Sequence, residues 1–495
     1  MPAKRSLTLA LALLLVAAIP ARGASFPAIT VVDEIRPGPV ASNALWNGGR
    51  LGDHLYFNAD DGATGFELWR TNGTTTTRVA NINTNTTGNI DSSPYGFTAL
   101  GDWLYFAAAD ATEGRELWRT NGTTTELFYD INTTGLGSSD PTGFTRLGDW
   151  LYFSATQGVS DTELWRTNAT GTQRVADIRP GSEGSSPSNF TAFGDWLYFM
   201  ADDGTHGTEL WRTDGTTTTL VEDISSGAAS SNPSCFTAFS GYLYFSANDG
   251  THGDELWRTN GTTITEMVED INVSFQTGSD PAGFTPFGDW LYFSAIDSTT
   301  GRELWRTNGT ITARVLDIYP GNNFGGAQDS NPEYFTALGD WLYFNASDGT
   351  NGAELWRTNG TTTTLVSDIY PGPNSSYPYG PIRLGNYIYF TASQGGDGKL
   401  WRVSAAGTIE SAAPAGTNVI FGCMCEHPIL TLNGRLFATM TSDETGFEFA
   451  YLDEATFGLP LTNRDGSMWS TALVPLAAVT AAAGVGLRMR EAKRA

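Results

Sequence analysis

The hexapeptide GDWLYF, or a close variant of it, recurs along most of the chain, and this repeat limits the fold more than any other feature of the sequence. Eight copies start 46 to 51 residues apart, at Gly52, Gly101, Gly148, Gly194, Ser240, Gly288, Gly339 and Gly385. Each copy is followed by ELWRT or a variant, and a degenerate ninth copy runs from Leu432 to Asp453. A period of this length is typical of arrays in which each repeat is one supersecondary unit.

Each period reads as four short strands. In the fourth copy these are FTAF, WLYFMA, TELWRT and TTTLVEDI, separated by a Gly-Asp turn, the loop DDGTHG and an Asp-Gly turn. Such dipeptides between β-rich runs are strong hairpin signals, and four antiparallel strands per period indicate a β-propeller blade. The alternation places Trp196 and Tyr198 on one face of the blade. Leu197 and Phe199 then lie on the other, so both faces are buried only when blades stack.

A propeller also needs a way to close its ring. The segment AITVVDEIRPGP, from Ala28, is similar to TLVSDIYPGP, from Thr364, which reads as a fourth strand and its loop. An N-terminal fourth strand could therefore complete the last blade. The fold class predicted is all-β, with a single propeller over residues 24–455. It has eight blades, or nine if the degenerate copy forms one, and a linear β-solenoid is the alternative.

The residues of the repeat resemble a known family. The segment ELWRTDGTTTTLVEDI, and ELWRTNGT in other copies, are similar to the secreted proteins built from ELWxxDGT repeats. The resemblance covers roughly residues 25–453; Asn replaces Asp in most turns, Lys399 replaces Glu in the eighth copy, and the ninth copy lacks the Trp. The resemblance implies a secreted or surface β-repeat protein, and it supplies no catalytic residues.

Both ends of the chain have the pattern of targeting segments. Residues 1–23 combine a basic start, an apolar centre and a small-residue end, as in a secretory signal peptide. Residues 469–487 carry no charge and could span about one bilayer as a helix, after a stalk at 456–468. The basic tail, residues 488–495, predicts a cytoplasmic C-terminus and a body at the cell surface. The alternative is a sorting signal that is processed, which would leave the protein secreted.

The balance of charge excludes one class of partner. The formal net charge is −25, and seven of the 28 basic residues lie in the two terminal segments, so the region between them is more acidic still. Nucleic acid requires a basic surface, so we expect no nucleic-acid partner. The acidity suits cations, basic partners or solubility.

The repeated charged residues favour a structural role. Every copy has the same Glu, Trp and Arg, whereas a catalytic centre places different residues around one point. We therefore expect Glu209 and Arg212 to be structural partners and Trp211 to lie in the core. The sequence has four histidines and no His-Glu-x-x-His, Gly-x-Ser-x-Gly or phosphate-loop motif.

The loop between the second and third strands carries an acid at one aligned position in six copies. These candidate calcium ligands are Asp61, Asp110, Asp203, Asp249, Asp297 and Asp348. Gln157 and Gln394 fill the position in the other two copies. Carboxylates could bind Ca²⁺ there together with backbone carbonyls, and the alternative is that each Asp caps its own turn. No other cofactor is predicted.

The three cysteines offer little further chemistry. Cys235 precedes an FTAF strand, where other copies have Gly, Asn or Tyr. Cys423 and Cys425 lie close to His427, but no second pair of metal ligands follows at a recognisable spacing. A disulfide or an exposed thiol suits this pair better than a metal.

Asn-x-Ser/Thr sequons are abundant, and six of them fall in the third hairpin turn, where turn chemistry already explains both residue types. The candidate glycosylation sites are Asn72, Asn85, Asn121, Asn132, Asn168, Asn189, Asn260, Asn272, Asn308, Asn345, Asn359 and Asn374.

These observations favour a non-enzymatic propeller at the cell surface. It would bind an extracellular protein or glycan through the loops of one face, in adhesion or envelope architecture. One alternative is a secreted enzyme acting on glycans, with a distinctive cluster of acids, Arg or Tyr at the ring centre. Its chemistry would be sought first in GTNVIFGCMCEHP, residues 416–428. Another alternative is a purely structural repeat protein.

Overall fold

The computed structural model is an all-β ring. It describes residues 46–412, except 135–136, 275–276, 324–325 and 397, together with 30–31, 35–36, 430–432, 435–442 and 446–453. The predicted signal peptide, stalk, membrane helix and tail therefore lie outside the described residues. Within the described part of the chain, no helix is long and apolar enough to span a membrane.

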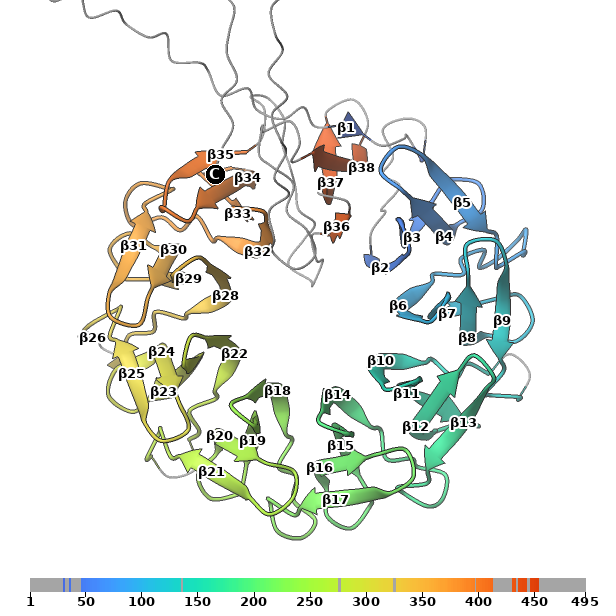
Figure 1. Ribbon diagram of the computed structural model, residues 1–495, viewed down its shortest axis with the longest axis horizontal. Coiled ribbons are helices and arrows are strands. Elements are labelled where there is room, and N and C mark those ends of the chain that lie inside the picture. Colours follow the sequence, from blue (N-terminus) through green and yellow to red (C-terminus); the bar gives the residue numbers. More distant parts are fainter. Residues whose placement is uncertain are drawn as a thin grey trace, which may run out of the picture.

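Eight four-stranded antiparallel sheets follow the eight copies of the repeat, and we number them blades 1 to 8 in chain order. Their first strands surround the ring centre (Figure 1): β2 (Trp46–Leu51), β6 (Tyr95–Leu100), β10 (Thr142–Leu147), β14 (Ser188–Phe193), β18 (Ser234–Phe239), β22 (Ala282–Phe287), β28 (Glu333–Leu338) and β32 (Tyr379–Leu384). The second strands are β3 (His54–Asp60), β7 (Trp103–Ala109), β11 (Trp150–Gln157), β15 (Trp196–Asp202), β19 (Tyr242–Asn248), β23 (Trp290–Asp297), β29 (Trp341–Ser347) and β33 (Tyr387–Ala392).

The third strands carry ELWRT, and the fourth strands form the outer edge of the ring (Figure 1). The third strands are β4 (Phe66–Thr71), β8 (Arg115–Thr120), β12 (Asp161–Asn168), β16 (Thr208–Thr213), β20 (Asp254–Thr259), β24 (Gly301–Thr307), β30 (Ala353–Thr358) and β34 (Lys399–Ser404). The fourth strands are β5 (Thr76–Ala80), β9 (Thr125–Tyr129), β13 (Gly171–Ala176), β17 (Thr218–Glu222), β21 (Thr265–Glu269), β25 (Thr312–Leu316), β31 (Thr363–Ser367) and β35 (Ile409–Ser411). A short hairpin, β26 (Asn322–Asn323) with β27 (Gly326–Ala327), lies between blades 6 and 7.

A ninth sheet completes the ring from both ends of the chain. The degenerate copy supplies β36 (Leu430–Leu432), β37 (Arg435–Ser442) and β38 (Gly446–Asp453), and the N-terminal strand β1 (Thr30–Val31) pairs antiparallel with β38. This sheet, blade 9, lies between blades 8 and 1 (Figure 1). The prediction of an N-terminal fourth strand is confirmed. The described sheets form nine blades in a ring, and the solenoid alternative does not apply.

Side chains bridge blade 9 and blade 1. Arg36, which follows β1, forms an ion pair with Asp60 at the end of β3. The same contact joins blades 3 and 4, where Arg179 pairs with Asp202 at 2.6 Å. Arg435 donates to the Gly73 carbonyl at 2.8 Å. The junction at which the chain ends meet thus uses contacts of the kind found inside the array.

The core lies between neighbouring blades. Tyr198 and Leu210 of blade 4 pack against Phe245 of blade 5, and none of these side chains exposes more than 1% of its surface. The other face of blade 4 presents Leu197 and Phe199 to blade 3. The predicted alternation is confirmed. Since burying one large apolar side chain contributes about 1.5–3 kcal/mol, each interface stabilises the blades on both its sides.

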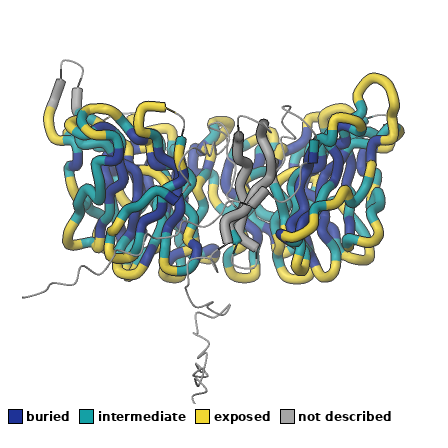
Figure 2. Tube along the Cα trace, turned by 90° about the horizontal axis from the view of Figure 1, so that it is seen from above, coloured by how far each residue is buried: buried dark blue, intermediate teal, exposed yellow. Residues whose placement is uncertain are grey.

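The loops divide between two rims of the ring. The loops between second and third strands contact the crossover loops between blades, as in the hydrogen bond from the Thr208 amide to the Ser230 hydroxyl. We call this rim the loop face. The first and third hairpin turns form the opposite rim, the turn face. Figure 2 shows exposed residues along both rims and buried residues between them.

A β-bulge near the start of each first strand explains the residue types seen around Cys235. In blades 2 to 8 the register shifts there, and the residue in the bulge has positive φ. Glycine fits this conformation, and in blade 2 a Cβ at Gly96 would meet the Phe144 ring of the next blade. The residues of the other bulges are Gly143, Asn189, Cys235, Gly283, Tyr334 and Gly380.

Candidate functional site

The glutamate of ELWRT organises the crossover loop that follows its own blade. In blade 4, the Glu209 carboxylate accepts hydrogen bonds from the amides of Ile224 and Ser225 at 3.0 and 3.3 Å. It also accepts from the amide and the hydroxyl of Ser231, at 2.9 and 2.5 Å. Its side chain is fully buried. One carboxylate therefore fixes both ends of the loop that leads into blade 5.

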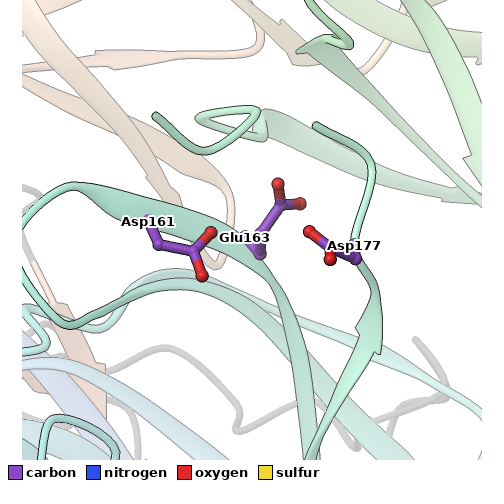
Figure 3. Close-up of side chains that lie close together, drawn as sticks. All are labelled: Asp161, Glu163 and Asp177. Carbon is purple, nitrogen blue, oxygen red and sulfur yellow. The ribbon is translucent and has the colours of Figure 1, made fainter. Parts of the chain in front are cut away.

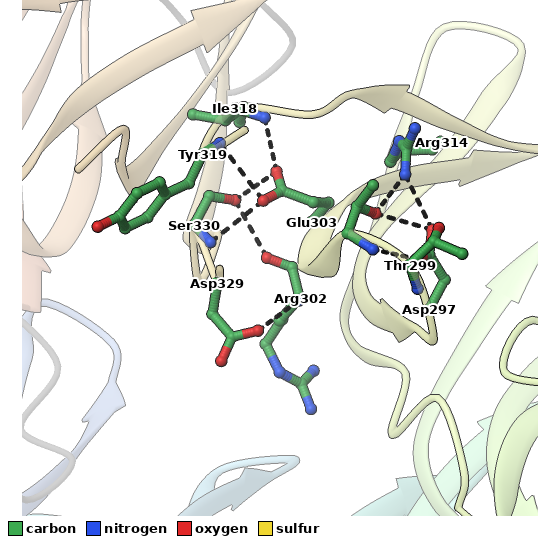
Figure 4. Close-up of polar contacts among 10 residues, drawn as sticks. Asp297, Thr299, Arg302, Glu303, Arg314, Ile318, Tyr319, Asp329 and Ser330 are labelled. Atoms are coloured by element: carbon green, nitrogen blue, oxygen red, sulfur yellow. Dashed lines mark hydrogen bonds and ion pairs between the residues drawn. The ribbon is translucent and has the colours of Figure 1, made fainter. Parts of the chain in front are cut away.

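The same arrangement recurs in seven blades, and Figure 4 shows it around Glu303 of blade 6. The glutamates are Glu67, Glu116, Glu163, Glu209, Glu255, Glu303 and Glu354, all 0% exposed. Their serine partners are Ser92, Ser139, Ser185, Ser231, Ser279, Ser330 and Ser376. Each of these serines begins a Ser-x-Pro sequence. The sequence analysis missed this motif, although its recurrence before the first strands of blades 2 to 8 is visible in the sequence.

Blade 8 lacks both the glutamate and its serine partner. Lys399 takes the place of the glutamate and is exposed, and no Ser-x-Pro sequence follows β35. The glutamate and its serine are thus lost together. The segment after β35, residues 413–429, includes Cys423, Cys425 and His427 and lies outside the described residues.

Burial raises the pKa of Glu67 and of Glu303 to about 7. The hydrogen bonds from the crossover amides and the serine hydroxyl lower it, but burial dominates. The pKa values of the other five are raised for the same reason. Perturbed acids often mark active sites. Here each acid is fully enclosed and hydrogen-bonded, so its role is to hold a loop.

In blades 1, 2, 5 and 6 the arginine of ELWRT donates to a backbone carbonyl in the third turn of the next blade. Arg306 donates to the Gly360 carbonyl in the third turn of the following blade at 2.8 Å. Its guanidinium also lies 4.2 Å from the centroid of the Trp290 ring in its own blade. Glu209 and Arg212 both have structural roles, as predicted, but they do not pair with each other. The glutamate binds the crossover loop and Arg212 stacks on Trp196, because side chains alternate between faces along a strand and Glu209 lies three positions before Arg212.

Seven of the eight repeat blades have this aromatic–arginine stack, with the guanidinium carbon 4.0 to 4.5 Å from the ring centroid. The pairs are Arg119 on Trp103, Arg166 on Trp150, Arg212 on Trp196, Arg258 on Tyr242, Arg306 on Trp290, Arg357 on Trp341 and Arg402 on Tyr387. Blade 1 is the exception, since His54 stands where the other blades have Trp or Tyr.

The six aspartates predicted as calcium candidates cap their own loops. Asp203 accepts from the amides of Thr205 and His206 at 2.8 and 2.9 Å, and its second oxygen contacts the His206 ring at 2.8 Å. The other five accept in the same way from the amides two and three residues ahead: Asp61, Asp110, Asp249, Asp297 and Asp348.

These hydrogen bonds explain the residue type without a metal. Burial raises the pKa of Asp203, but the bonds from the loop and from His206 lower it more, so the pKa lies below its ordinary value. Calcium binding at these loops stays a prediction. A melting point that rises in millimolar Ca²⁺ relative to EDTA would support it.

One group of three acids in blade 3 has oxygens close enough for a cation. Asp161, Glu163 and Asp177 place one oxygen each within 4.8 Å of the others, with Glu163 between the two aspartates (Figure 3). Arg174 already pairs with Asp161 and Asp177 at 2.9 and 3.2 Å. Glu163 holds its crossover loop through Ser185. The group is thus occupied by protein partners.

Nine of the twelve predicted sequons fall into two structural groups. The asparagines of the third turns accept hydrogen bonds from their own turns, as Asn72 does from the amides of Thr74 and Thr75 at 2.9 Å. Asn132, Asn272 and Asn345 are buried in the folded chain. Only modification before folding could reach those three.

The ring centre is less regular than the blades. A recess of about 480 Å³ opens on the first strands of blades 4 to 7, where Phe190, Phe236 and Cys235 line it. Exposed arginines occupy one equivalent first-strand position in blades 1, 3 and 8, namely Arg50, Arg146 and Arg383. Each donates through Nε to the glycine carbonyl two residues ahead. No carboxylate among the described residues pairs with these three guanidinium groups.

A second recess, of about 580 Å³, opens on the turn face between blades 1 and 2. His54 and Arg70 of blade 1 line it, with Asp102 and Asn121 of blade 2. The His54 side chain makes no hydrogen bond to a described residue, and the Arg70 side chain makes one, to the Gly122 carbonyl at 2.8 Å. Burial and the Arg70 charge lower the pKa of His54, so its ring is neutral at neutral pH.

Neither family models nor curated protein sequences match the chain. Among solved structures it is similar to a computationally designed protein, Ika8, at a TM-score of 0.40 and 13% identity, over 74% of this chain and 98% of that one. It is also similar to a prolyl endopeptidase, at a TM-score of 0.38 and 10% identity, over 72% of this chain and 55% of the peptidase. A third similar structure is a puromycin-hydrolysing peptidase of Mycobacterium tuberculosis, at a TM-score of 0.34 and 12% identity, over 74% of this chain and 60% of the peptidase.

The chain thus spans little more than half the length of each of the two peptidases. At these scores and identities the similarities give no basis for assigning an activity. The class of the protein rests on its own geometry, which is that of a β-propeller built from sequence repeats.

Proposed function

We propose that this chain is a non-enzymatic propeller of the cell surface, which binds an extracellular protein or glycan through its loop face. The resemblance of its repeat to ELWxxDGT proteins supports a secreted or surface location. The pattern of residues 469–487 supports a membrane anchor with the body outside, and processing of that segment would leave the protein secreted.

The observation that carries the proposal is that the repeated residues hold the scaffold together, whereas the residues that differ between copies lie in the loops. Three repeated charged side chains of blade 4 have scaffold partners: Glu209 holds a crossover loop, Arg212 stacks on Trp196, and Asp203 caps its turn. Such groups are not available to a substrate. The loops of one rim vary in length and sequence, and variable loops on a rigid scaffold are where binding usually occurs.

Exposed apolar residues point to the same rim. Val159, Val273 and Tyr377 are 97%, 74% and 67% exposed, and all three lie in loops of the loop face. Val159 is in a second-to-third-strand loop, and the other two are in crossover loops. A partner that binds the loop face would bury apolar side chains such as these, so the three positions serve to test the proposal.

The proposal is tested by a triple variant, Val159→Asp, Val273→Asp and Tyr377→Asp. Binding of the purified protein to immobilised cell-envelope fragments is measured by surface plasmon resonance. We expect the triple variant to bind at least about tenfold more weakly, since charge would replace the apolar contacts. The matched control is Ile311→Asp, because Ile311 is 55% exposed in a third turn on the turn face. Equal binding by the triple variant, the control and the unaltered chain would contradict the proposal.

A further inference from the structure

The array lacks one of its repeated contacts in blade 1. Seven repeat blades place a Trp or Tyr ring 4.0 to 4.5 Å from the arginine of ELWRT. The register of blade 1 places His54 opposite Leu51, as Trp196 lies opposite Phe193 in blade 4. Arg70 donates to the Gly122 carbonyl as Arg258 and Arg306 donate to theirs, but no Trp, Tyr or Phe ring lies against its guanidinium among the described residues. The arginine is therefore positioned as elsewhere, without its stacking partner.

The missing ring leaves an open recess with unused polar groups. The recess of about 580 Å³ extends from His54 and Arg70 to Asp102 and Asn121 of the next blade. The His54 side chain is half-buried, and its two ring nitrogens have no hydrogen-bond partner among the described residues. As a neutral imidazole it offers one donor and one acceptor. Asp53 and Asp102 are exposed at the rim.

We propose that this recess, the His54 recess, is a binding site for a planar aromatic ring that carries an amino group. A ring entering beside His54 would stack on Arg70 and restore the contact that Trp196 makes with Arg212. The carboxylates of Asp53 and Asp102 would pair with the ammonium group.

The site is independent of the function proposed above. It opens on the turn face, whereas the proposed partner surface is the loop face. Loss of binding at one site leaves the other unchanged, so the two proposals fail separately.

The test uses tryptamine, indole and propylamine as probes for the purified full-length chain. Binding is followed by ligand-observed NMR and by the shift of the melting midpoint. We expect tryptamine to bind at one site, indole several-fold more weakly, and propylamine not at all, because the ring supplies the stacking and the amine only the ion pair. Absence of tryptamine binding, or equal binding of propylamine, would overturn the proposal.

Two variants locate the site. His54→Trp supplies the ring that the other blades have, so we expect at least a tenfold loss of tryptamine affinity together with a higher melting midpoint. His252→Trp is the matched control, because it adds the same side chain in an exposed loop of the opposite face. Unchanged tryptamine binding by His54→Trp would overturn the proposal.

The reciprocal variant moves the recess to another blade. Trp196→His should expose Arg212 between blades 4 and 5 and raise the tryptamine stoichiometry from one to two. If it remains folded by circular dichroism and binds only one tryptamine, the missing ring does not define the site. Combining it with His54→Trp should then leave one site, at the new position.

Discussion

At the scale of single residues, the protein keeps seven carboxylates away from water. The geometry accommodates both protonation states of each. The Ser92 hydroxyl lies 2.7 Å from the Glu67 carboxylate and 3.0 Å from the Phe66 carbonyl. When Glu67 is ionised, the hydroxyl donates to it; when Glu67 is protonated, the acid donates to the serine, which then donates to the carbonyl. The crossover loop stays tied in either state.

The raised pKa values predict how stability depends on pH. The pKa of an unfolded glutamate is near 4.5, whereas those of Glu67 and Glu303 in the folded chain are about 7. Between these values the folded chain binds more protons than the unfolded chain, so the free energy of unfolding falls as pH rises. We expect the melting midpoint to be several degrees higher at pH 5 than at pH 7.5.

The control separates these glutamates from the general effect of a large negative charge. Glu303→Gln should weaken the fall in melting midpoint across this window. Glu183→Gln removes the same charge from a side chain that is 72% exposed and should leave it unchanged. Stability that rises from pH 5 to pH 7.5 would contradict the burial of ionisable glutamates.

At the scale of elements, the third hairpin turn has a role beyond reversing the chain. Its glycine lies against the tyrosine and arginine of the preceding blade. Gly261 has φ of +78°, and a Cβ there would overlap the hydroxyl of Tyr198. Both the left-handed backbone and the close approach therefore require glycine at this point.

Gly261→Ala tests the close approach. The backbone penalty is about 1–2 kcal/mol, and the clash with Tyr198 adds to it, so we expect a loss of about 2–4 kcal/mol in the free energy of unfolding. Gly227→Ala is the matched control, since Gly227 has φ of +87° and no neighbouring atom within 4 Å of the added Cβ. Urea unfolding of both variants measures the difference, and equal losses would show that the turn does not press on the preceding blade.

The strands of the repeat could be predicted because local signals agree with the fold. Hairpin dipeptides, the alternation in WLYFMA and the length of the period all specify four antiparallel strands. The orphan strand at Thr30 was also predictable, because its sequence matches other fourth strands. Copies of one pattern reinforce each other, so a weak signal in one blade is supported by the rest.

The partners of the charged residues could not be predicted in the same way. Glu209 and Arg212 share a strand, but the bonds of Glu209 reach residues 15 to 22 positions ahead, in a loop whose conformation the strand pattern does not encode. The Ser-x-Pro sequence was the available signal. The replacement of Trp by His at position 54 is visible in the sequence. The His54 recess could not be predicted from it, because the stacking of this position on the arginine of ELWRT is known only from the structure.

At the scale of the whole molecule, the residues that are the same in most copies stabilise the ring, and the residues that differ lie at a few surface sites. Glutamate in seven blades, arginine in four and the third-turn glycine tie a blade to its crossover loop or to a neighbouring blade. The loop face, the ring centre and the His54 recess carry the differences. Binding by this protein is therefore expected at these places, and the repeated segment ELWRT is expected to serve the ring.

Closure of the ring depends on both ends of the chain. Blade 9 obtains its fourth strand from Thr30–Val31, and Ile35, just after that strand, is 6% exposed. Without β1, the strand β38 would be an unpaired edge, which is a common start of aggregation.

The most direct test of the closed ring is the melting midpoint of a chain that lacks residues 1–36, compared with one that lacks residues 1–23. The shorter deletion removes only the predicted signal peptide and should melt like the body of the full chain. The longer deletion also removes β1, Ile35 and the Arg36–Asp60 ion pair. We predict a midpoint at least about 5 °C lower and concentration-dependent aggregation. Identical melting of the two chains would contradict a ring closed by its N-terminal strand.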